Sequence, residues 1–188
     1  AGKYARATQM YQKAYELHHE MGHARGEAYW LESLGSVYAN VNDYDRSLDY
    51  YDLALEKHRD IGNKSGEAAC LGQLGYVHID LENYEVAAQC FLSASDLYSR
   101  LGEKRGECIS QSNMAQLYYE TNKPDSGLQY CKKARQLIDR MNMPGLLAWV
   151  QLQMGDLYRS NGELVNAAKA YELGLTITEG LHLPEIRW

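Results

Sequence analysis

The residues best suited to chemistry lie near the amino end, where three histidines stand among acidic side chains. They are His18, His19 and His23, with Glu16 and Glu20 beside them. Imidazole and carboxylate groups bind zinc, and the four-residue spacing of His19 and His23 would place two ligands on one helical face. Gly22 stands between these two histidines and is typical of a helix end, which would separate the rings. The pattern therefore favours an exposed helix terminus over a metal site.

Cysteine is the other residue type that could carry chemistry. The four cysteines contain no Cys-x-x-Cys pair and no Cys/His spacing that would suit zinc. No Ser/His/Asp or Cys/His set has a spacing that would support an activated nucleophile. We therefore expect a protein that is not an enzyme and that uses no metal or cofactor. Free thiols also indicate a reducing compartment, so we expect a cytoplasmic protein.

The chain repeats its landmarks at a fixed distance of 40 residues. One series of landmarks is Gly26-Glu27, Gly66-Glu67 and Gly106-Glu107, and a second is Leu34-Gly35, Leu74-Gly75, Met114-Ala115 and Met154-Gly155. A constant period of this length is the signature of stacked helical units. The function is then expected to depend on a repeated surface and not on one catalytic centre.

Within one repeat the apolar residues predict two helices. The first runs from about Arg25 to Asn40, and after a turn the second runs from Tyr44 to about Asp60. Apolar residues recur at three- and four-residue spacing on one face of each helix, and Gly35 lets the two backbones approach closely. Each repeat is therefore predicted to be an antiparallel helical hairpin.

These hairpins predict an all-α fold, a right-handed α-solenoid of about nine helices. We expect one domain over residues 1–188, because the spacing does not slip. It would comprise a partial repeat over 1–22, full repeats over 23–62, 63–102, 103–142 and 143–182, and the start of a further repeat over 183–188. Pro144 and Pro184, also 40 residues apart, suit the first turn of a helix and support this phase.

The motifs resemble those of the tetratricopeptide repeat family. Leu31-x-x-Leu34-Gly35-x-x-Tyr38 is similar to its signature, and so are Ala87-x-x-x-Phe91 and Ala167-x-x-x-Tyr171. The usual repeat has about 34 residues, so the longer period makes this chain similar to the Pins/LGN-type spindle-orientation adaptors. The resemblance covers essentially the whole chain and implies a protein-binding role.

The residues that hold ligands in known members of that family are mostly replaced here. In the Pins/LGN-type repeats asparagines flank the Leu-Gly pair and hold a bound peptide, and only Asn113 matches them. The Lys/Asn/Arg set that holds a terminal carboxylate in chaperone-binding members is also missing. The resemblance therefore implies a peptide-binding groove and does not imply the same ligands.

A peptide in such a groove would contact the side chains that the first helix of each pair directs away from the second helix. By phase these are the apolar Tyr29, Tyr76, Ile79, Ile109, Tyr119, Trp149 and Leu152, the polar Gln73, Asn113, Gln116 and Gln153, and the charged Glu32, Asp80, Glu120, Asp156 and Arg159. Carboxylates outnumber the single guanidinium on this inner wall. A ligand with Lys or Arg between apolar anchors would therefore be favoured.

The overall charge limits the classes of partner. A formal net charge of -6 disfavours nucleic acid and anionic membranes, and no apolar run approaches the ~20 residues of a membrane span. We interpret the chain as an adaptor or scaffold module that binds a protein or peptide. The alternative is a structural spacer or a self-associating segment of a larger repeat protein, which would form a homo-oligomer. Solution mass and peptide capture would distinguish the two interpretations.

Overall fold

Nine α-helices and no strand occur in the part of the chain that the computed structural model describes, residues 2–139 and 141–180. Side chains are described from Tyr4 onward. The chain forms two compact units, Ala1–Leu101 (unit 1) and Gly102–Trp188 (unit 2). The all-α helical-repeat fold predicted from the sequence is confirmed. The predicted opening of a further repeat at 183–188 lies outside the described residues.

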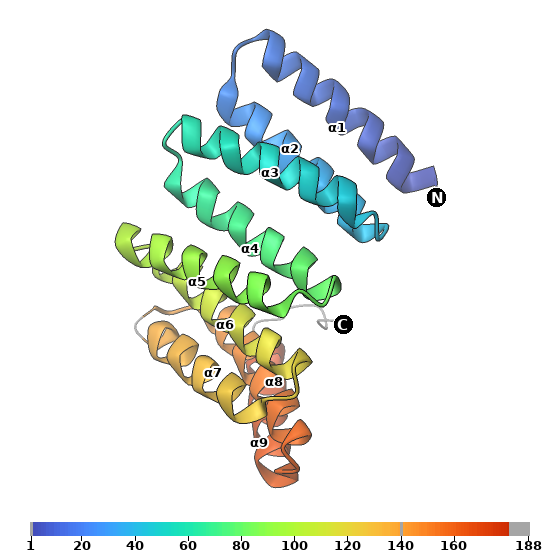
Figure 1. Ribbon diagram of the computed structural model, residues 1–188. Coiled ribbons are helices and arrows are strands. Elements are labelled where there is room, and N and C mark those ends of the chain that lie inside the picture. The colour runs from blue at the N-terminus through green and yellow to red at the C-terminus, as the bar shows by residue number, and fades with distance from the viewer. Residues whose placement is uncertain (1, 140, 181–188) are drawn as a thin grey trace. The chain divides into compact units, whose positions relative to one another are not determined.

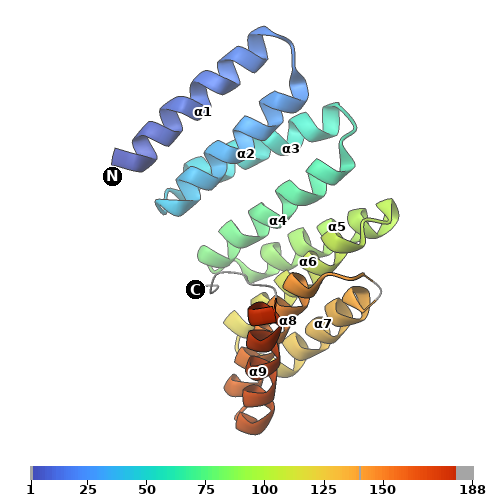
Figure 2. The same cartoon turned by 180° about the vertical axis from the view of Figure 1, so that it is seen from behind.

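Unit 1 consists of five helices, each packed against the next along the chain (Figures 1 and 2). They are α1 (Gly2–Glu20), α2 (Ala24–Asn40), α3 (Tyr44–Asp60), α4 (Lys64–Asp80) and α5 (Tyr84–Leu101). The pairs α2–α3 and α4–α5 are antiparallel hairpins, and α2 also touches α4. Leu31, Tyr51, Leu71 and Leu74 are among the buried side chains of its core.

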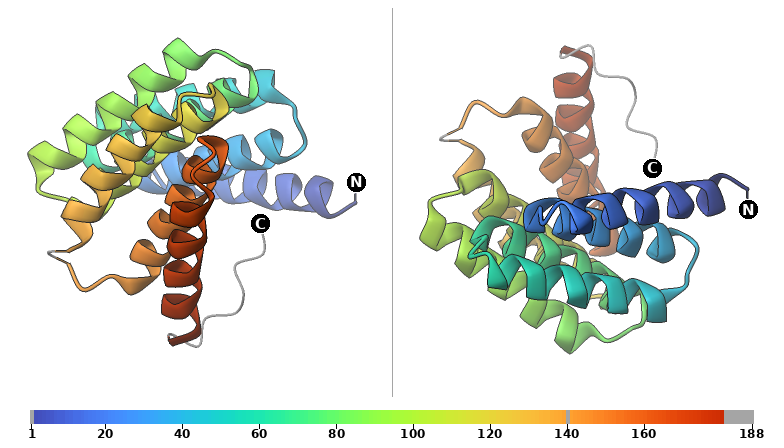
Figure 3. Two further views of the ribbon diagram at one scale, coloured as in Figure 1. Left: turned by 90° about the horizontal axis from the view of Figure 1, so that it is seen from below. Right: turned by 90° about the horizontal axis from the view of Figure 1, so that it is seen from above.

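Unit 2 consists of two hairpins, α6–α7 and α8–α9, which Figure 3 shows from below and from above. Their helices are α6 (Lys104–Glu120), α7 (Pro124–Ile138), α8 (Pro144–Ser160) and α9 (Leu164–Gly180). Helix α8 packs against α7 and also touches α6. The core contains Cys108, Leu128, Ile138 and Leu157. Pro124 and Pro144 occupy the first turns of their helices, where a missing N–H costs nothing.

Helix starts keep the 40-residue spacing. The first helices of the pairs begin at Ala24, Lys64, Lys104 and Pro144, and the second helices at Tyr44, Tyr84, Pro124 and Leu164. The two helices predicted for the first full repeat are therefore found to within one residue. The same spacing continues from unit 1 into unit 2. A single array over the whole chain stays a prediction.

Both kinds of turn depend on one residue with left-handed backbone. Between hairpins this residue is Gly22, Gly62 or Gly102, with φ of 65°, 66° and 71°, as their positions in the sequence predict. Within hairpins it is Asn42, Glu82, Asn122 or Gly162, with φ of 60°, 58°, 53° and 77°. The sequence predicts only a polar turn there. In each turn the following N–H closes the helix end, as Asp43 N donates to Tyr38 O at 2.9 Å.

The hairpins cross closely where a glycine of the first helix meets an aromatic ring of the second. A Cβ atom on Gly75 would lie 2.4 Å from Phe91 Cε1, and one on Gly155 would lie 2.4 Å from Tyr171 Cε1. Both distances are far below van der Waals contact. The close crossing inferred from the small residue at this repeat position is thus confirmed, and it fixes which faces of α2, α4, α6 and α8 remain available.

Candidate interaction surface

In unit 1 the predicted ligand-binding residues lie on α2 and α4, two helices that touch each other. We call this set the unit 1 wall: Tyr29, Glu32, Gln73, Tyr76, Ile79 and Asp80. Tyr29 is 58% exposed, and Gln73 and Asp80 are exposed, whereas the other three are half-buried. Burial raises the pKa of Tyr76 to about 12. The wall thus offers an aromatic ring, an amide and carboxylates to the surroundings.

In unit 2 the corresponding residues lie on α6 and α8, which also touch each other. We call this set the unit 2 wall: Ile109, Asn113, Gln116, Tyr119, Glu120, Trp149, Leu152, Gln153, Asp156 and Arg159. Glu120 and Arg159 are exposed, but Asn113, Leu152 and Gln153 are 3%, 9% and 8% exposed. The last three are therefore placed for packing within the chain. A ligand role for either wall stays a prediction.

Some wall residues are paired with the aromatic residue at the centre of their hairpin. Ser36 Oγ lies 2.7 Å from the hydroxyl of Tyr51, and the Tyr171 hydroxyl donates to Asp156 Oδ1 at 2.7 Å. Burial and the bond to Asp156 raise the pKa of Tyr171 to about 12. Asp156 also accepts a hydrogen bond from Arg159 at 3.1 Å. The charge of Asp156, predicted to face a ligand, is therefore balanced within unit 2.

Two buried glutamates join helix ends in unit 1. Glu27 Oε2 lies 2.8 Å from Lys57 Nζ, and this hydrogen bond is the main cause that lowers the pKa of Glu27. Burial raises the pKa of Glu67, but hydrogen bonds from Arg59 at 2.8 Å and Lys64 at 2.7 Å outweigh burial and lower it. The repeated Gly-Glu pair is the sequence signal for these ion pairs, although it predicts only the period by itself.

His58 connects the turn before α4 with the unit 1 wall. Its ring is 4% exposed, and Nε2 lies 3.1 Å from Glu32 Oε1 while Nδ1 lies 3.0 Å from Asn63 Nδ2. Asn63 Oδ1 accepts the N–H of Gly66 at 3.1 Å and so caps α4. Burial raises the pKa of Glu32, and His58 partly opposes this shift. The structural role predicted for His58 is confirmed.

The amino-terminal histidines are divided between two contacts. Helix α1 ends at Glu20, and His23 Nδ1 lies 2.8 Å from the Nδ1 atom of His18. His19 instead lies 3.3 Å from Glu27. Among the described residues, no group of three or more His, Cys, Asp or Glu side chains is arranged to hold a metal ion. His19 and His23, which have the spacing of metal ligands, are thus engaged separately.

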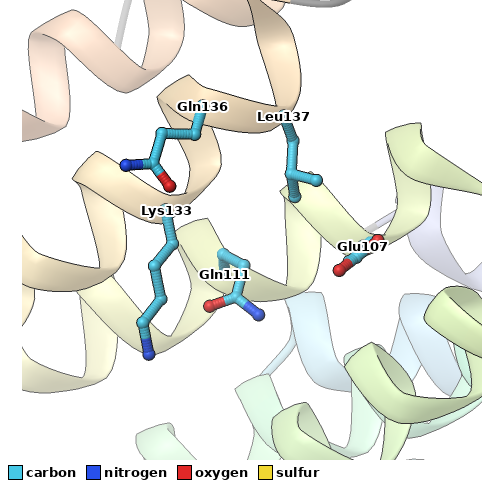
Figure 4. A pocket seen from close by; sticks show the side chains of 5 residues that line it. All are labelled: Glu107, Gln111, Lys133, Gln136 and Leu137. Atoms are coloured by element: carbon cyan, nitrogen blue, oxygen red, sulfur yellow. The ribbon is translucent and has the colours of Figure 1, made fainter.

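A crevice of about 240 Å³ lies between α6 and α7 in unit 2 (Figure 4). Helix α6 contributes Glu107 and Gln111, and α7 contributes Lys133, Gln136 and Leu137. Both charges in the crevice already have neighbours. Lys104 lies 2.7 Å from the Glu107 carboxylate, and the Lys133 ammonium lies 4.4 Å from the centre of the Tyr130 ring. This crevice therefore offers less to a charged ligand than the walls do.

Comparison with known proteins identifies the repeat. The model of the tetratricopeptide repeat family matches residues 26–100. No curated protein sequence matches the chain. Of the helices in the described ranges, none combines the length and the apolar character that crossing a membrane requires.

Several solved structures share the fold at low sequence identity. BtubC (BKLC) from P. vanneervenii superposes with a TM-score of 0.79 at 19% identity, over 100% of this chain and 78% of that one. A putative kinesin light chain repeat protein from Podosopora anserina gives 0.71 at 10% identity, over 96% and 89%. A Rap protein complexed with Competence and Sporulation Factor gives 0.79 at 18%, over 95% of this chain and 50% of that one. The specific likeness to Pins/LGN-type adaptors stays a prediction.

Proposed function

Residues 26–100 belong to the tetratricopeptide repeat family, and from this premise we propose that the protein is a non-catalytic adaptor or scaffold. It binds a peptide segment of a partner protein on the inner faces of α2 and α4 and of α6 and α8. The Rap protein of similar fold is complexed with Competence and Sporulation Factor in its structure, and a binding role for this chain agrees with that. The four free cysteines support a cytoplasmic location.

The observation that carries this proposal is the exposed chemistry of the unit 1 wall. Tyr29 leaves 58% of its surface to solvent, although the ring contacts only the edge of Trp30. Gln73 and Asp80 on α4 are exposed as well. Core packing does not need any of these three side chains, whereas a peptide could bury the ring and bond the amide and the carboxylate. Exposed aromatic and polar groups in this combination are typical of protein interfaces.

The charge of the two walls indicates a basic and apolar ligand segment. Asp80 in unit 1 and Glu120 in unit 2 are exposed carboxylates, and neither is joined to a cation by an ion pair between described residues. Lys or Arg side chains of a ligand would meet them favourably, and acidic segments would be repelled. Asp156 contributes less to this field because Arg159 accompanies it.

A display library of random peptides tests the proposal. The library is screened on the native protein, on an Asp80→Lys/Glu120→Lys variant, and on a Glu56→Lys/Glu172→Lys control. The control makes the same charge change at exposed positions of α3 and α9, away from the walls. Basic motifs should be selected by the native protein and by the control, and lost with the wall variant. Acidic motifs, or selection that ignores the wall charges, would show that the proposed surface is wrong.

Self-association is the second candidate, because both outer helices of the described chain expose apolar side chains. Helix α1 exposes Met10 and Leu17, and α9 exposes Leu164, Val165 and Leu175. Single exposed apolar residues are common, but several on one helix are typical of interaction surfaces. Light scattering at increasing concentration separates the candidates. A mass that rises toward a dimer, with no peptide selected, would favour the spacer over the adaptor.

A further inference from the structure

Three glutamates of unit 1 are buried or half-buried, and only one of them lacks a cation. Glu27 pairs with Lys57, and Glu67 pairs with Arg59 and Lys64. Glu32 has a single partner among the described residues, the Nε2 atom of His58 at 3.1 Å. The charge on Glu32 is therefore neutralised within the chain only if His58 itself carries a proton on both ring nitrogens.

The hydrogen bonds around His58 indicate a neutral ring. Because the N–H of Gly66 must meet an oxygen, the side-chain amide of Asn63 is oriented with Oδ1 toward α4 and Nδ2 toward His58. Nδ2 can only donate, so the Nδ1 atom of His58 accepts and carries no proton. The one ring proton is then on Nε2 and is donated to Glu32. A cationic His58 would have to turn Asn63 over, which would cost the α4 cap about 1 kcal/mol.

Glu32 thus keeps its negative charge while it remains reachable from solvent. Its side chain is 24% exposed. The exposed ring of Tyr29 stands one helical turn earlier on the same face of α2. At the positions 40 residues further on, α4 has Ala69 and Gly72, so the neighbouring helix adds no large side chain there. An aromatic ring and an uncompensated carboxylate on one face are the two elements that a guanidinium group prefers.

We propose that Glu32 and Tyr29 form a subsite for a basic side chain, best an arginine, of a bound peptide. The carboxylate accepts hydrogen bonds from the guanidinium, the Tyr29 ring covers its planar face, and His58 orients the carboxylate from behind. This inference rests on the proposed function and names the residue type that unit 1 recognises. His58 acts through Glu32 and is a positioning residue.

The subsite should release its ligand in acid. Glu32 loses its charge when it is protonated, and a second proton on His58 would place a cation beside the same carboxylate. Both events weaken the attraction for arginine. The other titratable groups near Glu32 are Tyr51 and Cys70, and burial raises the pKa of both, so they are uncharged as the pH falls. Lys57 and Arg59 stay engaged with the two other glutamates.

The test uses N-acetyl-arginine amide as the probe, with N-acetyl-norleucine amide as its uncharged counterpart. Binding is followed by NMR on protein labelled at glutamate carboxyl carbons and backbone amides. Arginine amide should shift the Glu32 carboxyl resonance at neutral pH, and norleucine amide should not. Glu32→Gln keeps an acceptor for His58 and should weaken binding about five- to tenfold, as expected for a half-buried charged hydrogen bond. Glu56→Gln, an exposed change on α3, should leave it unaltered.

A second variant guards against misfolding of the first. Tyr29 is exposed, so Tyr29→Ser leaves the core intact and should weaken arginine binding about two- to fivefold through loss of the cation–π contact. Equal binding by the native protein, Glu32→Gln and Tyr29→Ser would overturn the subsite. Peptides selected by display without dependence on Glu32 would also overturn it while the adaptor function stands. Arginine amide bound at Glu32 with no peptide selected would retain the subsite and sink the adaptor.

Discussion

Gly75 shows how little room the hairpins leave between their helices. A methyl group there would lie 2.4 Å from Phe91 Cε1, and Phe91 is fully buried. Gly75→Ala should therefore lower the free energy of unfolding by about 1–3 kcal/mol, although alanine favours helix. Thermal denaturation measures the effect, at about 2–4 °C for each kcal/mol in a chain of this size.

Gly180→Ala is the matched control. It makes the same chemical change in a helix, but no heavy atom lies within 4 Å of the added methyl group. Its melting temperature should equal or exceed that of the native protein. If both variants melt alike, the close crossing of α4 and α5 is not what makes glycine necessary.

Residue contacts were the least predictable level of this structure. The repeat phase places Asp156 on a helix face away from the second helix, yet the carboxylate reaches back to the Tyr171 hydroxyl. Asn113 and Gln153 have the polarity of surface residues and are buried. Periodicity gives the direction of a side chain from its own helix. It does not give the rotamer or the neighbouring helices, and these decide which charges and amides are already satisfied.

The turns inside the hairpins differ in how well their residues suit them. Asn42 and Asn122 tolerate left-handed backbone, but Glu82 has no such preference and adopts φ 58°. Replacing Glu82 by glycine removes this strain and should raise the free energy of unfolding by about 0.5–1 kcal/mol, after the greater flexibility of unfolded glycine is deducted.

Chemical denaturation of Glu82→Gly measures the gain, with Asn42→Gly as the control. Asparagine loses less than glutamate in this conformation, so the control should gain less or nothing. A loss of stability in Glu82→Gly would mean that the Glu82 side chain makes a contribution in the turn that outweighs its backbone strain.

Helices were more predictable than contacts because their signals are local. Gly22 and Gly62 mark helix ends through a conformation that other residues avoid, and Pro124 fits only the first turn of a helix. These signals recur every 40 residues, so each repeat checks the next. The left-handed Glu82 could not be predicted, because nothing in glutamate favours that conformation and only the closing hydrogen bonds of the turn impose it.

Over the whole chain, alkaline pH should unfold both units. Burial raises the pKa of Tyr76 in unit 1 and of Tyr171 in unit 2 from 10.0 to about 12. The unfolded chain therefore loses these protons first, so stability is complete below pH 10 and falls between pH 10 and about 12. Guanidinium midpoints at pH 8, 10 and 11 measure the decline.

The double variant Tyr76→Phe/Tyr171→Phe tests the cause of this decline. Phenylalanine cannot ionise, so the midpoint should fall less steeply between pH 10 and 11, although Tyr171→Phe also loses the bond to Asp156. Identical slopes for the native protein and the variant would assign the alkaline unfolding to other groups, such as the buried thiols of Cys108 and Cys131.

Each unit carries one tryptophan in its described residues, Trp30 in unit 1 and Trp149 in unit 2. Trp30 packs among Tyr11 and Tyr29, with ring centres 5.5 and 4.9 Å away, whereas Trp149 belongs to the unit 2 wall. The protein therefore contains an intrinsic fluorophore for each unit. With Trp188, which lies outside the described residues, replaced by phenylalanine, two single-tryptophan proteins would show by emission colour which unit a peptide covers, without any attached dye.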